Sequence, residues 1–213
     1  MADNVAPLPG RGKTLLSGAN RTLSATGAAS KLEGLCKNFN DRDSAAASFN
    51  QVRSQKTVKM MLVRNVSGIA LAAKSVVKWA TGYRNRRVGG YCSVNFEEVA
   101  GVVDEFIGSA GVPNNDLFWL AVAGPSLVRK SLAANAECVI AEGQVLVALT
   151  AVTSQAATAG RILPFAATSD VTSIGSMSLN RVGRALSAST TSQTGGSVTP
   201  DILVDLEIQA QAS

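Results

Sequence analysis

The chain has 213 residues, of which 46% are hydrophobic, 16% are charged and 5% are aromatic, and its formal net charge is +5. This length suits one domain with or without a tail, and so large an apolar fraction excludes a wholly disordered chain. The chain contains no histidine, which removes the commonest general base and metal ligand and the usual partner of a nucleophilic Ser or Cys, so we expect no enzymatic activity, no metal and no cofactor.

Residues 1–56 have the composition of a flexible basic N-terminal arm, because they are rich in Gly, Ser, Asn and Ala and sustain no strand or helix period. A short helix around Ala28–Cys36 can form here only against a partner. Residues 1–90 carry 15 basic and four acidic residues, a net +11, whereas residues 91–213 carry five basic and eleven acidic residues, a net −6. This asymmetry predicts a basic segment that faces a polyanion, joined to a neutral or acidic body; a loop-rich half with merely solvated charges is the alternative.

Two β-favouring runs, Thr57–Val66 and Ile69–Trp79, follow the arm, and a basic turn at Tyr83–Gly90 comes after them. The alternation in the first run places Val58, Met60, Leu62 and Arg64 on one face of a strand and Lys59, Met61 and Val63 on the other. Neither face is purely polar, so both faces of this strand have apolar residues to bury.

Phe96–Gly108 is the clearest predicted helix. Asn95 and Glu98 have the spacing of a capping box, and the valines that follow recur at helical spacing as an apolar stripe. Gly108 and Pro113 would end the helix. We therefore expect a helix packed on the core between two strands.

The rest of the chain predicts short strands, separated by turn signals every 10–20 residues or so, a spacing typical of a β-sandwich or barrel. The expected strands are Leu117–Ala123 (ended by Gly124-Pro125), Cys138–Ala141, Val145–Val152, Ile162–Ala167, Met177–Leu186 and Ile202–Ile208. In the last strand, one face carries Ile202, Val204, Leu206 and Ile208 and the other carries Leu203, Asp205 and Glu207, as in a half-buried antiparallel strand. Alanine-rich stretches in this half leave a mainly helical fold open as an alternative.

No export signal or membrane span is expected, because the first 30 residues lack an apolar core and no run of about 18 apolar residues occurs. The three cysteines, Cys36, Cys92 and Cys138, are an odd number and lie far apart. They fit free thiols in a reducing compartment better than a disulfide framework.

No motif in the chain supports catalysis. Gly10–Thr14 (GRGKT) resembles the end of a phosphate-binding loop, but Pro7 stands where the first glycine is required and no strand precedes it. The same residues suit nonspecific phosphate contact, because glycine lets the backbone approach and Arg and Lys supply charge.

Basic residues are the candidate RNA-binding site, since guanidinium and ammonium groups neutralise phosphate and the low aromatic content argues against base-specific stacking. The candidates are Arg11, Lys13, Arg21, Lys31, Lys37, Arg42, Arg84, Arg86 and Arg87. For the last three, which are flanked by Tyr83 and Tyr91, a subunit contact or a solvated turn is an equal alternative.

Three segments carry a family resemblance: LFWLAVAGPS (Leu117–Ser126), AECVIAEGQVLVALTAV (Ala136–Val152) and ILVDLEIQ (Ile202–Gln209). Their order and spacing resemble the central and final strands of the capsid proteins of small plant RNA viruses, within these the brome mosaic and cucumber mosaic virus group. The resemblance covers residues 117–213, and it implies a single jelly-roll β-sandwich at residues 57–213 and an arm facing packaged RNA.

The resemblance further implies a large homo-oligomer of identical subunits around viral single-stranded RNA, no membrane partner, and a location in the virion and the host cytoplasm. The basic residues of this arm are dilute, which favours charge neutralisation over specific packaging. A helical or flexuous virus coat protein, which would be mostly helical, and a cellular nucleic-acid-binding module with a basic tail are the alternatives. The arm assignment also predicts that deleting residues 1–40 abolishes encapsidation and leaves the body folded.

Overall fold

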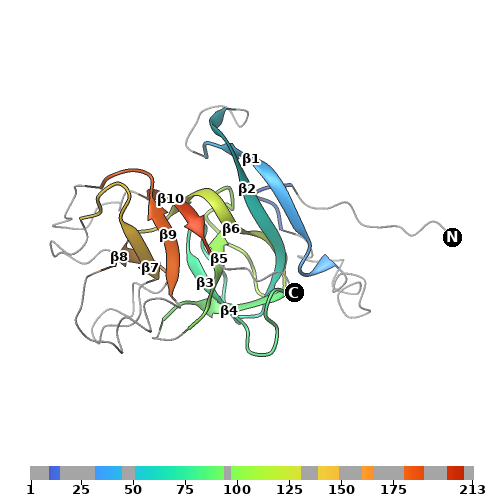
Figure 1. Ribbon diagram of the computed structural model, residues 1–213. Helices are drawn as coiled ribbons and strands as arrows, with labels where there is room; N and C mark the ends of the chain where they lie inside the picture. The colour runs from blue at the N-terminus through green and yellow to red at the C-terminus, as the bar shows by residue number, and fades with distance from the viewer. Residues whose placement is uncertain are drawn as a thin grey trace.

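Ten β-strands make up the regular structure of the computed structural model, which describes residues 10–14, 32–44, 51–93, 97–130, 139–148, 160–165, 180–189 and 201–208 (Figure 1). In chain order the strands are β1 (Cys36–Arg42), β2 (Val52–Asn65), β3 (Val76–Trp79), β4 (Arg87–Tyr91), β5 (Val99–Val103), β6 (Leu117–Val128), β7 (Val145–Ala148), β8 (Ile162–Pro164), β9 (Arg181–Ala185) and β10 (Ile202–Glu207). These described ranges contain no α-helix, and so none that could cross a membrane. The fold is therefore mainly β, and the mostly helical alternative is contradicted.

Five of the strands pair in a closed ring, in the order β2–β6–β5–β3–β4. Four of the five contacts are antiparallel, and the parallel contact of β4 with β2 closes the ring through the pairs Arg64–Arg87 and Asn65–Val88. Beyond the ring, the second half of β6 pairs with β10, and the row continues through β9 and β7 to β8. Figure 1 shows this row on one side of the ring and the β1–β2 hairpin on the other.

Two apolar clusters follow from the strand alternation. The first fills the ring, and every ring strand contributes to it: Met61, Val63, Val77, Val88, Ala100, Val103, Phe118, Leu120 and Val122 are among its members. The second joins the opposite faces of β2, β3, β5 and β6 to β7–β10, and includes Val58, Met60, Leu62, Trp119, Leu146, Val182, Ile202, Val204 and Leu206. The predicted faces of Thr57–Val66 and of Ile202–Ile208 are confirmed. Val58, Met60 and Leu62 lie in the second cluster, and Met61 and Val63 of the other face lie in the first, while Lys59 is exposed. In Ile202–Ile208, the apolar face lies in the second cluster.

The helix predicted at Phe96–Gly108 is wrong, because Val99–Val103 is strand β5. Its five residues are all buried, with Ala100 and Val103 in the ring and Val99 and Val102 in the second cluster. A short run of valines that is buried on both faces satisfies the helical spacing as well as the strand spacing, and β-branched residues then favour the strand. Of the proposed capping pair, Asn95 lies outside the described residues and Glu98 forms an ion pair with Arg84.

Strand β6 continues through Gly124-Pro125, where the sequence predicted its end. Gly124 has a φ of 88°, and a Cβ at this position would overlap the Thr57 carbonyl oxygen. The register with β2 shifts just before this point, between Lys59 and Met60. Gly124 therefore turns β6 away from β2 and onto β10 instead of ending it.

Four of the strands predicted after residue 140 are present in the described residues. β7, β8, β9 and β10 lie within the predicted ranges. In the predicted strand Cys138–Ala141, Ile140 makes only an isolated bridge to Ser189. Cys138 and residues 149–152 lie outside the described residues.

Part of the segment assigned to the flexible arm belongs to the sheet. β1 pairs with β2 over Cys36–Arg42, and β2 itself begins at Val52. The helix expected at Ala28–Cys36 is also absent from its described part, since residues 32–35 form a turn that leads into β1. β1 has little apolar alternation of its own. Its Phe39 ring packs edge-on against the Trp119 ring, with the two ring centroids 5.1 Å apart.

Candidate nucleic-acid interface

Gly10–Thr14 forms a turn that is fastened to the end of β5. The Gly12 amide donates to Asp104 Oδ2 at 2.8 Å, and Arg11 Nη2 lies 3.0 Å from Asp104 Oδ1. Gly12 has a φ of 71°, and a Cβ there would lie 2.5 Å from the Phe106 carbonyl oxygen. Only glycine fits this approach, so the GRGK motif serves an attachment of the N-terminal segment to the body.

A buried carboxylate cluster lies under this turn. The side chains of Asp41, Asp104 and Glu105 are fully buried, and Arg53 lies 2.9 Å from Asp41 Oδ1 and 2.6 Å from Glu105 Oε1. Burial alone lowers the pKa of Arg53, but its hydrogen bonds to Glu105 and Asp41 and their charges outweigh burial and raise the pKa. Arg53 therefore remains a cation, and the cluster joins β1, β2 and the loop after β5 by charge.

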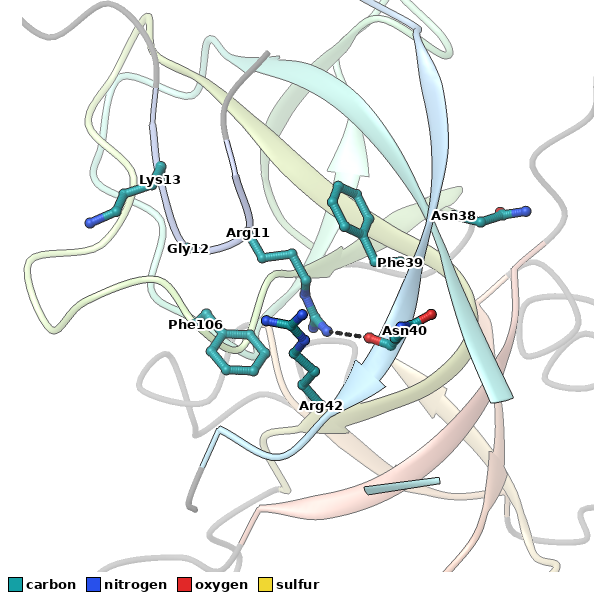
Figure 2. Close-up of a pocket in the computed structure, with 8 residues that line it drawn as sticks. All are labelled: Arg11, Gly12, Lys13, Asn38, Phe39, Asn40, Arg42 and Phe106. Carbon is teal, nitrogen blue, oxygen red and sulfur yellow. Dashed lines mark hydrogen bonds between the residues drawn. The ribbon is translucent and has the colours of Figure 1, made fainter. Parts of the chain in front are cut away.

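Beside the turn lies a groove of about 510 Å³, which Figure 2 shows between the turn, strand β1 and the Phe106 ring. Its lining combines cationic, amide and aromatic side chains, from Arg11, Gly12, Lys13, Asn38, Phe39, Asn40, Arg42 and Phe106. The Arg11 guanidinium lies 4.4 Å from the Phe106 ring centroid and donates to the Asn40 carbonyl oxygen at 3.3 Å. Lys13 points away from Arg11 (Figure 2) and is exposed.

The β1–β2 hairpin adds further cations beside this groove. Lys37, Arg42 and Lys59 are exposed, and Lys59 is the cross-strand neighbour of Asn38 in the groove wall. Lys37 Nζ lies 5.1 Å from the Phe39 ring centroid. Lys37 lies opposite Met60 and Lys59 lies opposite Asn38, so the two lysines project from opposite sides of the hairpin. We call the set of exposed cations around the groove, Lys13, Lys37, Arg42 and Lys59, the hairpin face.

The basic turn at Tyr83–Arg87 has a different environment, because a buried glutamate lies against it. Glu33 is fully buried at its side chain, with Arg64 Nε at 2.5 Å, Arg87 Nε at 2.9 Å and Arg86 Nε at 3.8 Å. Arg84 forms an ion pair with Glu98. This turn therefore holds the segment before β1 onto the ring by ion pairs within the chain.

The structure separates the nine predicted residues into groups. Lys13, Lys37 and Arg42 belong to the hairpin face. Arg84 forms an ion pair with Glu98, and Arg86 and Arg87 form ion pairs with Glu33. The Arg11 side chain is only 9% exposed and forms an ion pair with Asp104. Arg21 and Lys31 lie outside the described residues. Sequence reasoning missed Lys59, although a lysine between the apolar residues Val58 and Met60 of a predicted strand was available as a signal.

The hairpin face can neutralise phosphate, and its groove offers amide groups and a partly covered aromatic ring next to those charges. No protein-family model, no curated protein and no solved structure matches the chain. The function is therefore inferred from the site.

Proposed function

We propose that the protein is a viral capsid subunit that assembles with identical copies and packages single-stranded RNA by charge neutralisation. One observation carries the RNA contact: Lys13, Lys37 and Lys59 are exposed and form no ion pair with any carboxylate of the described residues. In the same part of the chain, Glu33 and Asp41 are buried beneath arginines. The outer surface there is more positive than the residue count implies, which suits a polyanion.

Self-assembly is supported by the composition and by the sheet edges. Only 16% of residues are charged, compared with about 25% in typical soluble proteins, as expected when subunit contacts replace charged surface. β1 and β8 end the strand order, and apart from the isolated bridge of Ile162 to Lys130 each has one edge without a strand partner among the described strands. Such edges and uncharged faces suit contacts between copies, and we expect no enzymatic activity.

The jelly-roll form of the fold remains part of this proposal. The mostly antiparallel pairing and the apolar cluster that joins the ring strands to β7–β10 support it. An experimental structure of the assembled protein tests it, because a jelly roll has two facing four-stranded sheets in Greek-key order.

Assembly is tested by mixing the purified protein with single-stranded RNA and examining it by electron microscopy and sedimentation at low and moderate salt. We expect uniform particles that protect the RNA from nuclease. A protein that binds RNA but stays monomeric at both salt concentrations would contradict the capsid proposal and favour a cellular nucleic-acid-binding module.

The RNA contact is tested with Lys13→Gln/Lys37→Gln/Lys59→Gln. Because each phosphate contact contributes about 0.7 to the slope of log K against log salt for single strands, we expect the slope to fall by about 2 and the affinity to drop. The matched control is Lys56→Gln/Arg181→Gln/Arg184→Gln, which removes the same charge from residues paired with Asp205 and Glu207. Equal losses in the two variants would show that only net charge matters and that the hairpin face is not the site.

Deletion of residues 1–40 is a poorer test than the sequence suggested. The deletion removes Arg11 and Glu33, which pair with buried groups, and five residues of β1. We therefore expect the deletion to destabilise the body, contrary to the prediction from the arm assignment.

A further inference from the structure

A second cavity, of about 350 Å³, lies where the loop before β3 meets the ends of three other strands. Lys74 precedes β3, Arg129 follows β6, Arg161 precedes β8 and Asp201 precedes β10. All four line the cavity, together with residues of the loop after β5. The volume falls within the range of about 300–1,000 Å³ that small-ligand sites occupy.

Backbone hydrogen bonds fix the three cationic residues next to one another. The Arg129 amide donates to the Lys74 carbonyl oxygen at 2.9 Å, and the Ile162 amide, next to Arg161, donates to the Arg129 carbonyl oxygen at 3.0 Å. Lys74 has a φ of 64°, a strained value for a residue with a side chain, and its amide is held by the Val103 carbonyl oxygen at 2.9 Å. The three cationic side chains therefore extend from a backbone that hydrogen bonds hold in place, as a preorganised binding site requires.

The cavity has more cationic than anionic groups available. Asp201 is paired with Lys74 at 2.6 Å. Glu105, which also lines the cavity, already accepts from Arg53 at 2.6 Å and from Ser44 at 2.8 Å. Among the described residues, the Arg129 guanidinium has no hydrogen bond and no ion pair with a carboxylate.

Arg161 lies close enough to Arg129 for the two charges to repel. Its Nη1 donates to the Lys130 carbonyl oxygen at 3.2 Å, which holds one side of the guanidinium in place. Burial, and after it the charge of Arg129, lower the pKa of Arg161, and Asp201 only partly offsets them. An anion placed between the two guanidinium groups would relieve this repulsion.

We propose that this cavity binds a phosphate oxyanion, held by Arg129 and Arg161 with Lys74 at its side. The planar donor groups of two guanidiniums match the geometry of phosphate oxygens. A carboxylate ligand would need only one arginine, whereas this cavity is lined by two, which favours the more highly charged phosphate. The phosphate comes either from free inorganic phosphate or from the backbone of RNA. The site is separate from the hairpin face, and its existence does not depend on RNA packaging.

The test is titration of the full chain with inorganic phosphate and pyrophosphate, by calorimetry and by thermal unfolding, against sodium chloride of equal ionic strength. We expect saturable binding and a higher Tm in phosphate. Arg129→Gln/Arg161→Gln should weaken binding at least about tenfold, since each charge-assisted bond is among the stronger hydrogen bonds. Arg181→Gln/Arg184→Gln, which removes equal charge on β9, should leave binding unchanged. No preference for phosphate over chloride, or equal binding by all three proteins, would overturn the proposal.

Arg129→Gln alone guards against a folding defect, because this side chain has no hydrogen-bond or ion-pair partner among the described residues. Retained phosphate affinity in this single variant would also overturn the site. A short oligouridylate distinguishes the two sources of phosphate. If the oligonucleotide competes with phosphate, and Arg129→Gln/Arg161→Gln abolishes its binding, the site binds the RNA backbone. If phosphate binds and the oligonucleotide does not compete, the site binds the free anion. Lys13→Gln/Lys37→Gln/Lys59→Gln should keep phosphate binding, so failure here and failure of the proposed function are separable.

Discussion

The hairpin face and the Tyr83–Arg87 turn look alike in sequence but differ in what opposes their charges. Both are basic and lie beside aromatic residues. At the turn, Arg86 and Arg87 approach the buried carboxylate of Glu33, and Arg87 also lies 4.4 Å from the Tyr83 ring centroid. On the hairpin face, Lys37 and Lys59 are exposed with no ion pair to a described carboxylate.

This difference shows that the number of basic residues in a segment does not measure the charge it offers to a ligand. A guanidinium that lies on a buried acid stabilises the fold, because separating the pair would leave a charge in a low-dielectric interior. A lysine on an exposed strand costs little to redirect toward phosphate. The turn is therefore assigned to stability and the hairpin face to binding, and four experiments test that assignment.

The largest expected effect is a difference in alkylation rate between the two described cysteines, Cys36 in the β1–β2 hairpin and Cys92 after the Tyr83–Arg87 turn and β4. Cys36 begins β1 and is exposed, whereas Cys92 follows β4 and is buried, and burial raises the pKa of Cys92 to about 12 from a normal value of 9.0. At neutral pH, a pKa of about 12 leaves Cys92 almost entirely as the unreactive thiol. In a Cys138→Ser background, iodoacetamide followed by mass spectrometry should modify Cys36 first by a wide margin. Similar rates at both positions would mean that the β4 end is open in solution.

The next effect is on Glu33, the acid beneath the turn. Glu33→Gln removes the charge that compensates Arg64, which is 6% exposed, and should lower the free energy of unfolding in urea by about 3–5 kcal/mol. The control is Glu207→Gln, because its pairs with Arg181 and Arg184 are exposed and should contribute only about 0–1 kcal/mol. Equal losses would contradict a structural role for the turn.

A smaller effect is expected for the glycines of the two regions. Gly12 and Gly82 have similar φ values, 71° and 78°, but only Gly12 has atoms within 4 Å of an added Cβ. Gly12→Ala should therefore cost about 1–3 kcal/mol from strain and overlap, and Gly82→Ala about 1 kcal/mol from strain alone. Urea unfolding of both variants measures the difference. If Gly12→Ala is the milder of the two, the turn at residues 10–14 is not fastened to the body.

The smallest effect is expected for RNA binding by the turn itself. Arg86 is 51% exposed, and Arg86→Gln should reduce RNA affinity less than threefold, because its charge lies opposite Glu33. Lys59→Gln is the matched comparison on the hairpin face, and we expect the larger loss there. If Arg86→Gln lost more RNA affinity than Lys59→Gln, the turn would be the RNA-binding region and the hairpin face would not.

Much of the strand pattern could be predicted because alternation is a local property. The faces of Thr57–Val66 and Ile202–Ile208 are confirmed by burial in the two clusters. At β5 the local pattern was insufficient, because five consecutive buried residues have no polar face to set a period. β1 was missed for the opposite reason, since its one partly buried apolar side chain among polar neighbours, Phe39, packs on Trp119, which lies 80 positions away.

The amino-acid sequence by itself determined the mainly β class, the faces of the alternating strands and the basic character of the first 90 residues. Each of these depends on composition or on neighbours a few residues away. Only the tertiary structure decided the closed ring of five strands and which cations pair with Glu33 and Asp41. It also decided which arginines surround the second cavity. These outcomes depend on contacts between distant segments, and burial determines there whether a charge stabilises the fold or remains available to a ligand.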